Sequence, residues 1–192
     1  MKKSIIIAVD AMGGDDSPKK IIKGIELFHK KNKHVFYKIF GNKNMILENL
    51  HHSNLNQEFY EIIHTEEKIE NEDSALAGAK KGKNTSMWLA VESVKNKSSD
   101  IVLSAGNTGA LFVIAKLNFK MIENISKPAL SGLWPNRTGM NIVLDLGANI
   151  ECDENNLEDF SLMGSALYRS LFENIIPKVA LLNIGSEELK GH

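Results

Sequence analysis

Cysteine is almost absent from this sequence. Its 192 residues include one, Cys152, which excludes an intrachain disulfide and any metal site built from several cysteines. A reducing cytoplasm suits such a composition. We expect Cys152 to be a small buried hydrophobic residue, and the alternative is a nucleophile that forms a thioester intermediate.

Long apolar runs and an excess of one charge are absent too. No stretch approaches the roughly 18–20 apolar residues that are needed to span a bilayer. The net charge is −1, which gives no electrostatic argument for binding to nucleic acid. The Gly-x-Gly-x-x-Gly pattern of nicotinamide-binding proteins and the Gly-x-Ser-x-Gly elbow of hydrolases are both missing. The six histidines lie outside the main glycine turns, and we expect them at the surface.

Apolar segments of two periodicities alternate along the chain. Runs rich in β-branched residues predict strands, and apolar residues at helical spacing predict helices. Strands are expected at 4–9, 35–40, 58–64, 100–104, 128–133, 140–146 and 179–184, and helices at 17–31, 44–51, after 74, after 86, at 110–121 and at 155–172. The alternation implies a single α/β domain over residues 1–192, with three α/β/α layers and a largely parallel sheet. An acidic segment, 66–73, is expected to be an exposed loop.

Four glycine-containing turns each follow a predicted strand, at 10–15, 104–110, 145–149 and 183–185. Because the carboxyl ends of parallel strands border the ligand crevice of an open α/β sheet, we expect these turns along one edge. Glycine lets backbone N–H groups approach a ligand closely, and the start of a following helix favours an anion. The turns therefore predict a site for an anion.

The turn at 104–110 is the strongest of the four. Between a strand and a helix it offers free backbone amides, the Asn107 amide and the Thr108 hydroxyl, which suit a phosphate or the oxyanion of an acyl transfer. The alternative is a tight strand–helix turn in which Asn107 or Thr108 only caps the helix.

Aspartates accompany the other turns. Asp10, Asp15 and Asp16 surround Gly13-Gly14, and Asp145 begins the third turn. Such carboxylates hold a metal, orient a substrate hydroxyl or cap neighbouring loops, and sequence alone does not separate these roles. We assign no metal and no cofactor.

At these turns the sequence resembles the bacterial phosphate acyltransferases of the PlsX family. The resemblance rests on the order and spacing of segments 9–15 with Pro18, 104–110, 143–149, and 180–185 with Glu187 and Lys190-Gly191. Two departures occur, because residues 72–75 lack the family's proline and Gly82 replaces a basic residue. The resemblance implies a fold like the isocitrate and isopropylmalate dehydrogenases. Members of the family continue beyond residue 192, so we expect this chain to be a C-terminally truncated portion of a longer catalytic chain.

The resemblance also implies a reaction. The family transfers a fatty acyl group from acyl carrier protein to inorganic phosphate, and the resulting acyl phosphate feeds glycerol-3-phosphate acylation in phospholipid synthesis. It implies a homodimer that is cytoplasmic, peripherally membrane-associated and partnered by a membrane glycerol-3-phosphate acyltransferase. Two alternatives stay open: an NAD- and metal-dependent dehydrogenase on the same fold, and a non-catalytic module that docks the carrier protein.

The candidate site combines residues from several turns with a lysine near the end of the chain. We expect catalytic roles for Asn107, Thr108, Lys190 and Asp10. The residues expected to bind phosphate or substrate are Gly13, Gly14, Asp15, Ser104, Gly106, Gly109, Asp145, Gly147 and Asn149. Since phosphate is partly dianionic near pH 7 and a thiolate leaves readily, the reaction needs positioning and oxyanion stabilisation more than a strong base.

Overall fold

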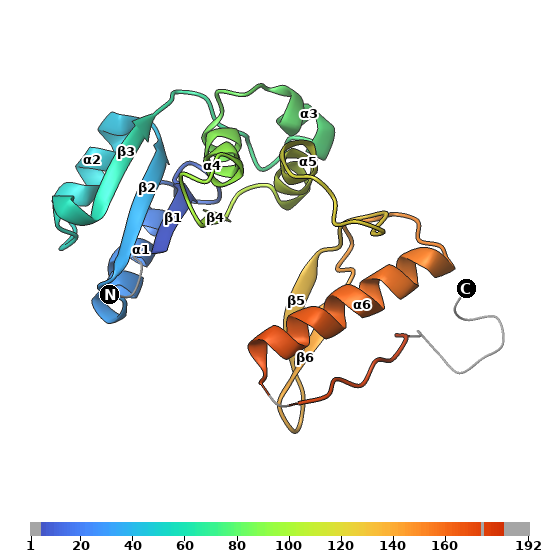
Figure 1. The fold of residues 1–192 in the computed structure, drawn as a ribbon. Helices are drawn as coiled ribbons and strands as arrows, with labels where there is room; N and C mark the ends of the chain where they lie inside the picture. Colours follow the sequence, from blue (N-terminus) through green and yellow to red (C-terminus); the bar gives the residue numbers. More distant parts are fainter. Residues whose placement is uncertain (1–4, 174, 183–192) are drawn as a thin grey trace. The chain divides into compact units, whose positions relative to one another are not determined.

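The computed structural model describes residues 5–173 and 175–182, which belong to two compact units (Figure 1). Unit 1 is Met1–Lys120 and unit 2 is Met121–His192, and each is described by itself. The single domain expected from the sequence stays a prediction. Among the described residues, no helix combines the length and the apolar character needed to cross a membrane.

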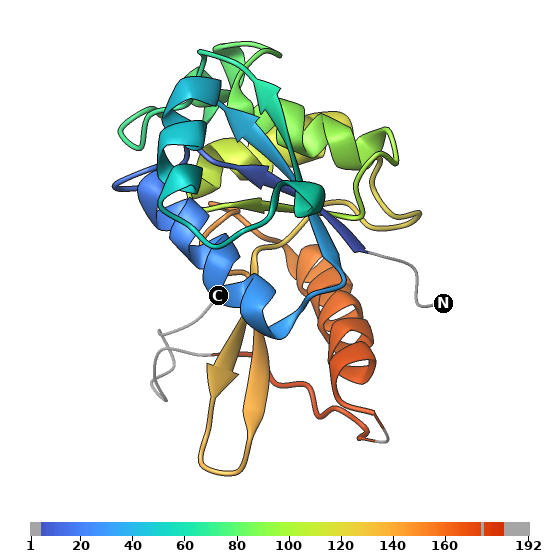
Figure 2. The same ribbon diagram turned by 90° about the vertical axis from the view of Figure 1, so that its left-hand side faces the viewer.

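Unit 1 is built on a four-stranded sheet that is entirely parallel. Its strands are β1 (Ile5–Asp10), β2 (Val35–Gly41), β3 (Tyr60–His64) and β4 (Ile101–Ser104), in the order β3-β2-β1-β4 (Figures 1 and 2). The chain adds β2 and β3 on one side of β1 and then returns to place β4 on the other side. The order therefore reverses between β1 and β4, and ligands of open α/β sheets bind beyond the carboxyl ends of the strands at such a point.

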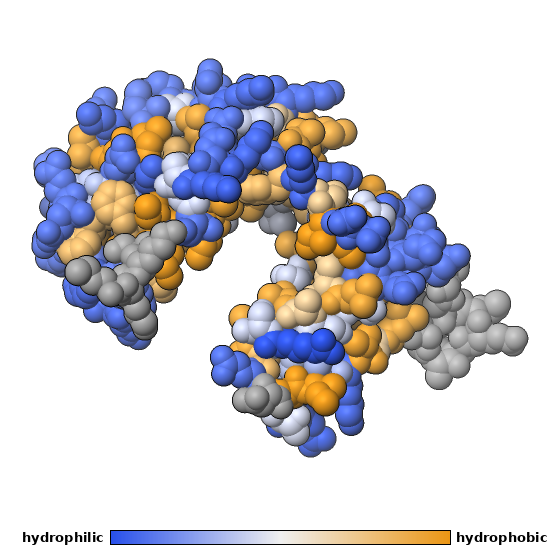
Figure 3. Space-filling view, in the orientation of Figure 1, coloured by the Kyte–Doolittle hydropathy of each residue, from blue (hydrophilic) through white to orange (hydrophobic). Residues whose placement is uncertain are grey.

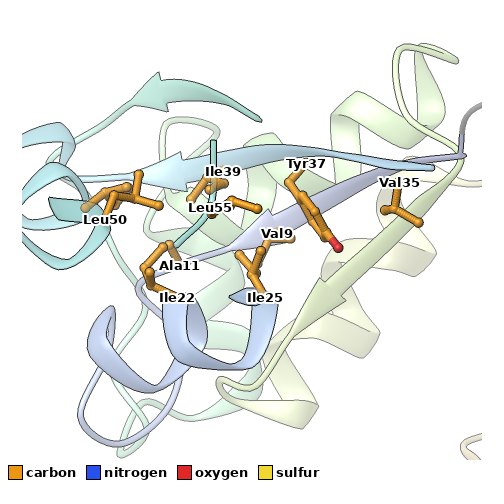
Figure 4. Close-up of a cluster of buried hydrophobic side chains, with 10 residues drawn as sticks. Val9, Ala11, Ile22, Ile25, Val35, Tyr37, Ile39, Leu50 and Leu55 are labelled. Carbon is orange, nitrogen blue, oxygen red and sulfur yellow. The ribbon is translucent and has the colours of Figure 1, made fainter. Parts of the chain in front are cut away.

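Helices cover both faces of this sheet, which confirms the predicted α/β class. The helical elements of unit 1 are α1 (Lys19–Lys31), α2 (Lys43–His51), the short η1 (Gln57–Phe59), α3 (Ala75–Lys80), α4 (Ser86–Lys95) and α5 (Thr108–Asn118). Side chains of α1 and α2 pack with those of β1 and β2 on one face, where Ile22, Ile25 and Tyr37 are buried (Figure 4). On the other face, Ala90 of α4 packs against Ala8 and Phe40.

The helical spacing of apolar residues predicts that the buried stripe of α1 consists of Ile21, Ile22, Ile25 and Phe28, and the structure differs from this prediction. Ile22 and Ile25 are buried as predicted, but Phe28 is 48% exposed and the polar Glu26 and His29 are buried instead. Glu26 is stabilised there by ion pairs with two lysines of its own helix. The pair Ser17-Pro18 predicts Ser17 as the N-cap and Pro18 as the first helical residue. This is wrong, because Pro18 occupies the N-cap position and no side chain caps the helix.

The loop from β3 to α3 contains the acidic segment 66–73. Its side chains are mostly exposed, as predicted. Figure 3 shows that hydrophilic residues cover most of the upper surface of unit 1 in this view. Ile69 is the exception, because it is 3% exposed and packs in the cluster that α4 and α5 share. One apolar residue thus anchors an otherwise solvated loop to the core of unit 1.

Unit 2 contains an antiparallel hairpin and a long helix. The elements are β5 (Ser131–Pro135), β6 (Met140–Leu144) and α6 (Glu154–Leu171), and α6 packs on β6. The two strands were predicted, but not that they pair antiparallel in a sheet of their own. The four residues 136–139 between them are too few for the crossover that parallel neighbours need.

The last strand predicted, 179–184, is wrong for the residues that can be compared. Residues 179–182 have irregular backbone, and 183–184 lie outside the described part of the chain. Apolar β-branched sequence makes a strand only where a neighbouring strand completes its hydrogen bonds. Within the described residues, 179–182 pair with no strand.

Candidate functional site

The carboxyl ends of β1 and β4 meet at Asp10 and Ser104, which are register partners. Asp10 is only 1% exposed, and a buried carboxylate is tolerated where hydrogen-bond donors surround it. The Ser104 hydroxyl donates to Oδ2 at 2.7 Å, the Ser86 hydroxyl donates to Oδ1 at 2.7 Å, and the Met12 amide donates to Oδ1 at 3.2 Å. Asp10 thus joins β1 to β4 and to the start of α4.

The first two glycine turns pack against each other directly above this carboxylate. A Cβ atom on Gly13 would lie 2.6 Å from Asp10 Oδ2 and 2.8 Å from the Gly106 nitrogen. Gly14 has a φ of +88°, and a Cβ there would lie 2.6 Å from the Ala105 carbonyl oxygen. These contacts leave no room for a side chain, so Gly13 and Gly106 serve the close approach of two backbones. That approach places the start of α5 beside the turn after β1.

Asn107 caps α5 and ties it to the acidic loop. Its side-chain oxygen accepts the Ala110 amide at 2.9 Å, which is the capping interpretation set out above. Thr108 and Gly109 are the next two residues, in the first turn of α5. Within residues 5–173 and 175–182, their backbone amides have no hydrogen-bond acceptor, and neither has the exposed Thr108 hydroxyl. The free donors expected at this turn are therefore present, and the neighbouring Asn107 side chain caps α5 and bonds to the acidic loop. A catalytic role for Asn107 or Thr108 stays a prediction.

The acidic loop contacts both turns through one asparagine. Asn71 donates to Asp15 Oδ1 at 3.0 Å, and its carbonyl accepts the Asn107 side-chain amide at 3.1 Å. The same Asn107 amide donates to the Asp73 carbonyl at 2.7 Å. Lys81 lies 2.6 Å from the Asp73 carboxylate, and together with a backbone amide of the loop it holds the pKa of Asp73 below its usual value. Asp15 thus orients the loop in this structure.

The third turn lies in unit 2 and is organised by Asp145. Its carboxylate accepts the amides of Leu130, Ala148 and Asn149 at 2.9, 3.3 and 2.7 Å, as well as the Asn149 side-chain amide at 3.0 Å. Partial burial raises the pKa of Asp145, but these hydrogen bonds outweigh it, so the pKa lies below its usual value. Gly147 has a φ of +87°, which suits glycine at this turn. The carboxylate oxygens are thus occupied by the loop itself.

Other predictions from the sequence have mixed outcomes. Cys152 is exposed, so the expectation of a buried cysteine is wrong. His29 is buried against Tyr37 and Phe59, which contradicts the expected surface position, and burial lowers its pKa.

The fourth turn at 183–185 and Lys190 lie outside the described residues, so their places in the site stay predictions. In the part of the chain that is described, no three His, Cys, Asp or Glu side chains are grouped to hold a metal.

Two residues of this constellation were missed from the sequence, Ser86 and Asn71. The sequence Asn84-Thr85-Ser86 predicts a helix cap, which Thr85 provides for α4, and does not indicate that Ser86 donates to Asp10. Its one signal is a polar residue directly before an apolar run, 87–91, at the start of α4. Asn71 lies in an acidic loop without periodicity, and nothing in its neighbourhood marks it.

The chain matches a known family over nearly its whole length. A family described as "Fatty acid synthesis protein" matches residues 5–192. Among curated proteins, a phosphate acyltransferase of Pelagibacter ubique is 63% identical over 192 residues, all of this chain and 57% of the relative. Phosphate acyltransferases of Paramagnetospirillum magneticum and of a Bradyrhizobium species (strain BTAi1) are 38% and 40% identical over the whole chain, which covers 55% of each.

The chain thus spans little more than half the length of the curated relatives it matches. The similarity includes both units and the three turns described above, since the whole chain is aligned. A match of this extent is not limited to a shared motif. The chain therefore belongs to the fatty acid synthesis protein family, and it is similar throughout to curated phosphate acyltransferases.

Proposed function

We propose that the protein to which this chain belongs transfers a fatty acyl group from acyl carrier protein to inorganic phosphate. The products are acyl phosphate and free carrier protein, and acyl phosphate feeds phospholipid synthesis. The names of the curated relatives support transfer to phosphate, and the family description supports a fatty acyl substrate. They favour this reaction over hydride transfer by a dehydrogenase and over simple docking.

The start of α5 carries the proposal. It lies at the point where the strand order reverses, and its first two amides, at Thr108 and Gly109, have no acceptor within the described residues. Unsatisfied N–H groups at a helix start, together with the helix dipole, attract phosphate and other oxyanions. The Thr108 hydroxyl adds a third donor at the same end.

The chemistry that we propose needs such donors and little else. A phosphate oxygen attacks the thioester carbonyl carbon, a C–O bond forms, and the C–S bond breaks as the tetrahedral intermediate collapses. The thiolate leaves with the electron pair and takes a proton from water. Donors fixed at the start of α5 hold the phosphate or stabilise the oxyanion, and fixed donors of this kind are among the largest contributors to acyl transfer.

The remaining parts of the hypothesis concern the complete protein. We propose a dehydrogenase-like fold, a homodimer and a cytoplasmic enzyme that associates peripherally with the membrane. Its expected partners are acyl carrier protein and a membrane glycerol-3-phosphate acyltransferase. Lys190 and the turn after Asp145 are proposed to complete the site in that protein.

A pair of substitutions at Thr108 tests the proposal. Thr108→Ala removes the hydroxyl, and Thr108→Pro removes the hydroxyl and the free amide. Proline is tolerated at the first position of a helix, and the Asn107 ψ of 109° suits a residue before proline. The complete protein is assayed for phosphate-dependent loss of acyl–carrier thioester, with hydroxylamine to trap acyl phosphate.

We expect Thr108→Pro, which loses both the amide and the hydroxyl, to lower turnover by at least roughly 100-fold, and Thr108→Ala, which keeps the amide, to lower it less. Circular dichroism and thermal unfolding check that α5 remains intact in both variants. Thioester loss that proceeds equally well without phosphate would refute the proposed reaction. Near-normal turnover of a folded Thr108→Pro protein would remove the start of α5 from the mechanism.

A further inference from the structure

Among the residues that the structure describes, the Ser86 hydroxyl has one hydrogen-bond partner, the buried Asp10 carboxylate. Ser86 is 1% exposed and is the first residue of α4, and its hydroxyl donates to Asp10 Oδ1 at 2.7 Å. Its backbone amide donates to the Glu67 carbonyl at 3.0 Å, so the same residue also holds the acidic loop. Nothing about α4 itself requires this hydroxyl, because the Thr85 side chain already caps the helix.

A chain of contacts leads from Ser86 to the start of α5. Asp10 Oδ2 accepts the Ser104 hydroxyl at 2.7 Å, and the Ser104 oxygen in turn accepts the Gly106 amide at 3.1 Å. Gly106 precedes the cap of α5 and packs against the Gly13 backbone, where a Cβ on Gly106 would lie 3.0 Å from the Gly13 Cα. The orientation of the carboxylate therefore sets where the turn before α5 lies.

We infer that Ser86 is a positioning residue, which acts through Asp10 and Ser104 to place the first amides of α5. The inference rests on the proposed function, in which those amides bind phosphate or the oxyanion. Without the Ser86 hydroxyl, Asp10 Oδ1 keeps, from the described part of the chain, only the longer 3.2 Å bond from the Met12 amide. A buried carboxylate that is short of donors turns toward a new partner, and Ser104 and the α5 turn move with it.

Another buried serine of α4 provides a matched control. Ser93 is 7% exposed, and its hydroxyl bonds to Ser98 and Ser99 at 2.9 and 2.7 Å, at the other end of the helix. Ser93→Ala therefore removes a buried hydroxyl from the same helix without touching the Asp10 network. A merely structural role for Ser86 predicts that both alanine variants lose stability and that neither changes the kinetics of the folded enzyme.

Two readouts are compared in the complete protein for Ser86→Ala, Ser86→Cys and Ser93→Ala. The first is the KM for phosphate, the KM for the acyl thioester, and kcat. For Ser86→Ala we expect kcat/KM for phosphate to fall about tenfold with the thioester KM unchanged. Ser86→Cys should recover part of this loss, because a thiol of similar shape donates weakly, and Ser93→Ala should stay within twofold of the parent.

The second readout is the backbone amide NMR signals of Thr108 and Gly109, which need no activity. We expect Ser86→Ala to shift them and to change their exchange with solvent, and Ser93→Ala to leave them unchanged. If Ser86→Ala fails to fold, the comparison is made with Ser86→Cys. Equal kinetics and unmoved amides in a folded Ser86 variant would overturn the inference while the parent reaction stands. A parent protein without phosphate-dependent turnover overturns the proposed function instead, and the amide signals still decide whether Ser86 positions α5.

Discussion

Replacing Gly13 by alanine should separate the two glycine turns of unit 1. The added Cβ would lie 2.6 Å from Asp10 Oδ2, 2.8 Å from the Gly106 nitrogen and 2.9 Å from the Gly106 Cα. Two of these three neighbours are backbone atoms, and the third is the end of a buried side chain that hydrogen bonds from Ser86 and Ser104 hold in place. The turns must therefore move apart by about half an ångström, and overpacking of this kind costs about 2–3 kcal/mol of unfolding free energy.

Gly24→Ala is the matched control for this substitution. Gly24 lies in α1, and a Cβ there meets nothing within 4 Å. Alanine at this position should stabilise the protein by about 0.5–1 kcal/mol, since glycine weakens a helix interior. Both variants thus replace a glycine by an alanine, and they should change the free energy of unfolding in opposite directions.

Urea unfolding measures the stability of both variants relative to the parent. The phosphate-dependent thioester assay measures how each substitution affects the site. We expect Gly13→Ala to lose activity at temperatures where it is still folded, because the start of α5 is displaced. A Gly13→Ala protein as stable as its parent, with normal turnover, would refute the close-approach argument. A loss of stability in Gly24→Ala equal to that in Gly13→Ala would point to a general intolerance of alanine.

Two further predictions concern carboxylates. Hydrogen bonds from Lys23 and two further donors lower the pKa of Glu26 from 4.5 to about 2. The ionised Glu26 carboxylate therefore adds fully to the free energy of unfolding above pH 4.5, and this contribution is lost as the pH falls toward 2. In urea unfolding, Glu26→Gln should accordingly be less stable than the parent at pH 7 and equal to it near pH 2. A difference in stability that does not change with pH would contradict the lowered pKa of Glu26. Asp145→Asn should cost about 2 kcal/mol in unit 2, because one of the carboxylate's acceptor oxygens becomes a donor. Hydrogen exchange at the Leu130 and Asn149 amides should accelerate, and unchanged protection would exclude this role.

Much of unit 1 follows from its sequence. The strands that begin at Ile5 and Val35 and the helix α5 were predicted within two or three residues of their observed ends, because their apolar residues follow a clear period. The position of the first two turns at the ends of β1 and β4 also follows, since a parallel sheet leaves its connections there. The periodicity of apolar residues does not show which strands are neighbours in the sheet.

The contacts that organise the site were harder to predict. Ser86 and Asp10 are 76 residues apart, and nothing local to either one shows that they touch. An Asn side chain before a helix suits either a ligand or a cap, and the sequence leaves both open for Asn107. In the structure its oxygen caps α5 and its amide donates to the acidic loop. His29 is buried because it packs against aromatic residues of other elements, Tyr37 of β2 and Phe59 of η1.

The sheet order has a consequence for how this site comes into being. The strands β1, β2 and β3 are made one after another, and each pairs with the one before it, so most of the sheet assembles from nearby segments. The bond between Asp10 and Ser104 joins residues 94 positions apart. Closing so long a loop carries a larger entropic cost than the earlier pairings, and it waits until β4 has been synthesised. On a ribosome, the first strand therefore leaves the exit tunnel long before Ser104 is available to bond with Asp10, and an early-arrested chain has a β-layer that lacks this contact.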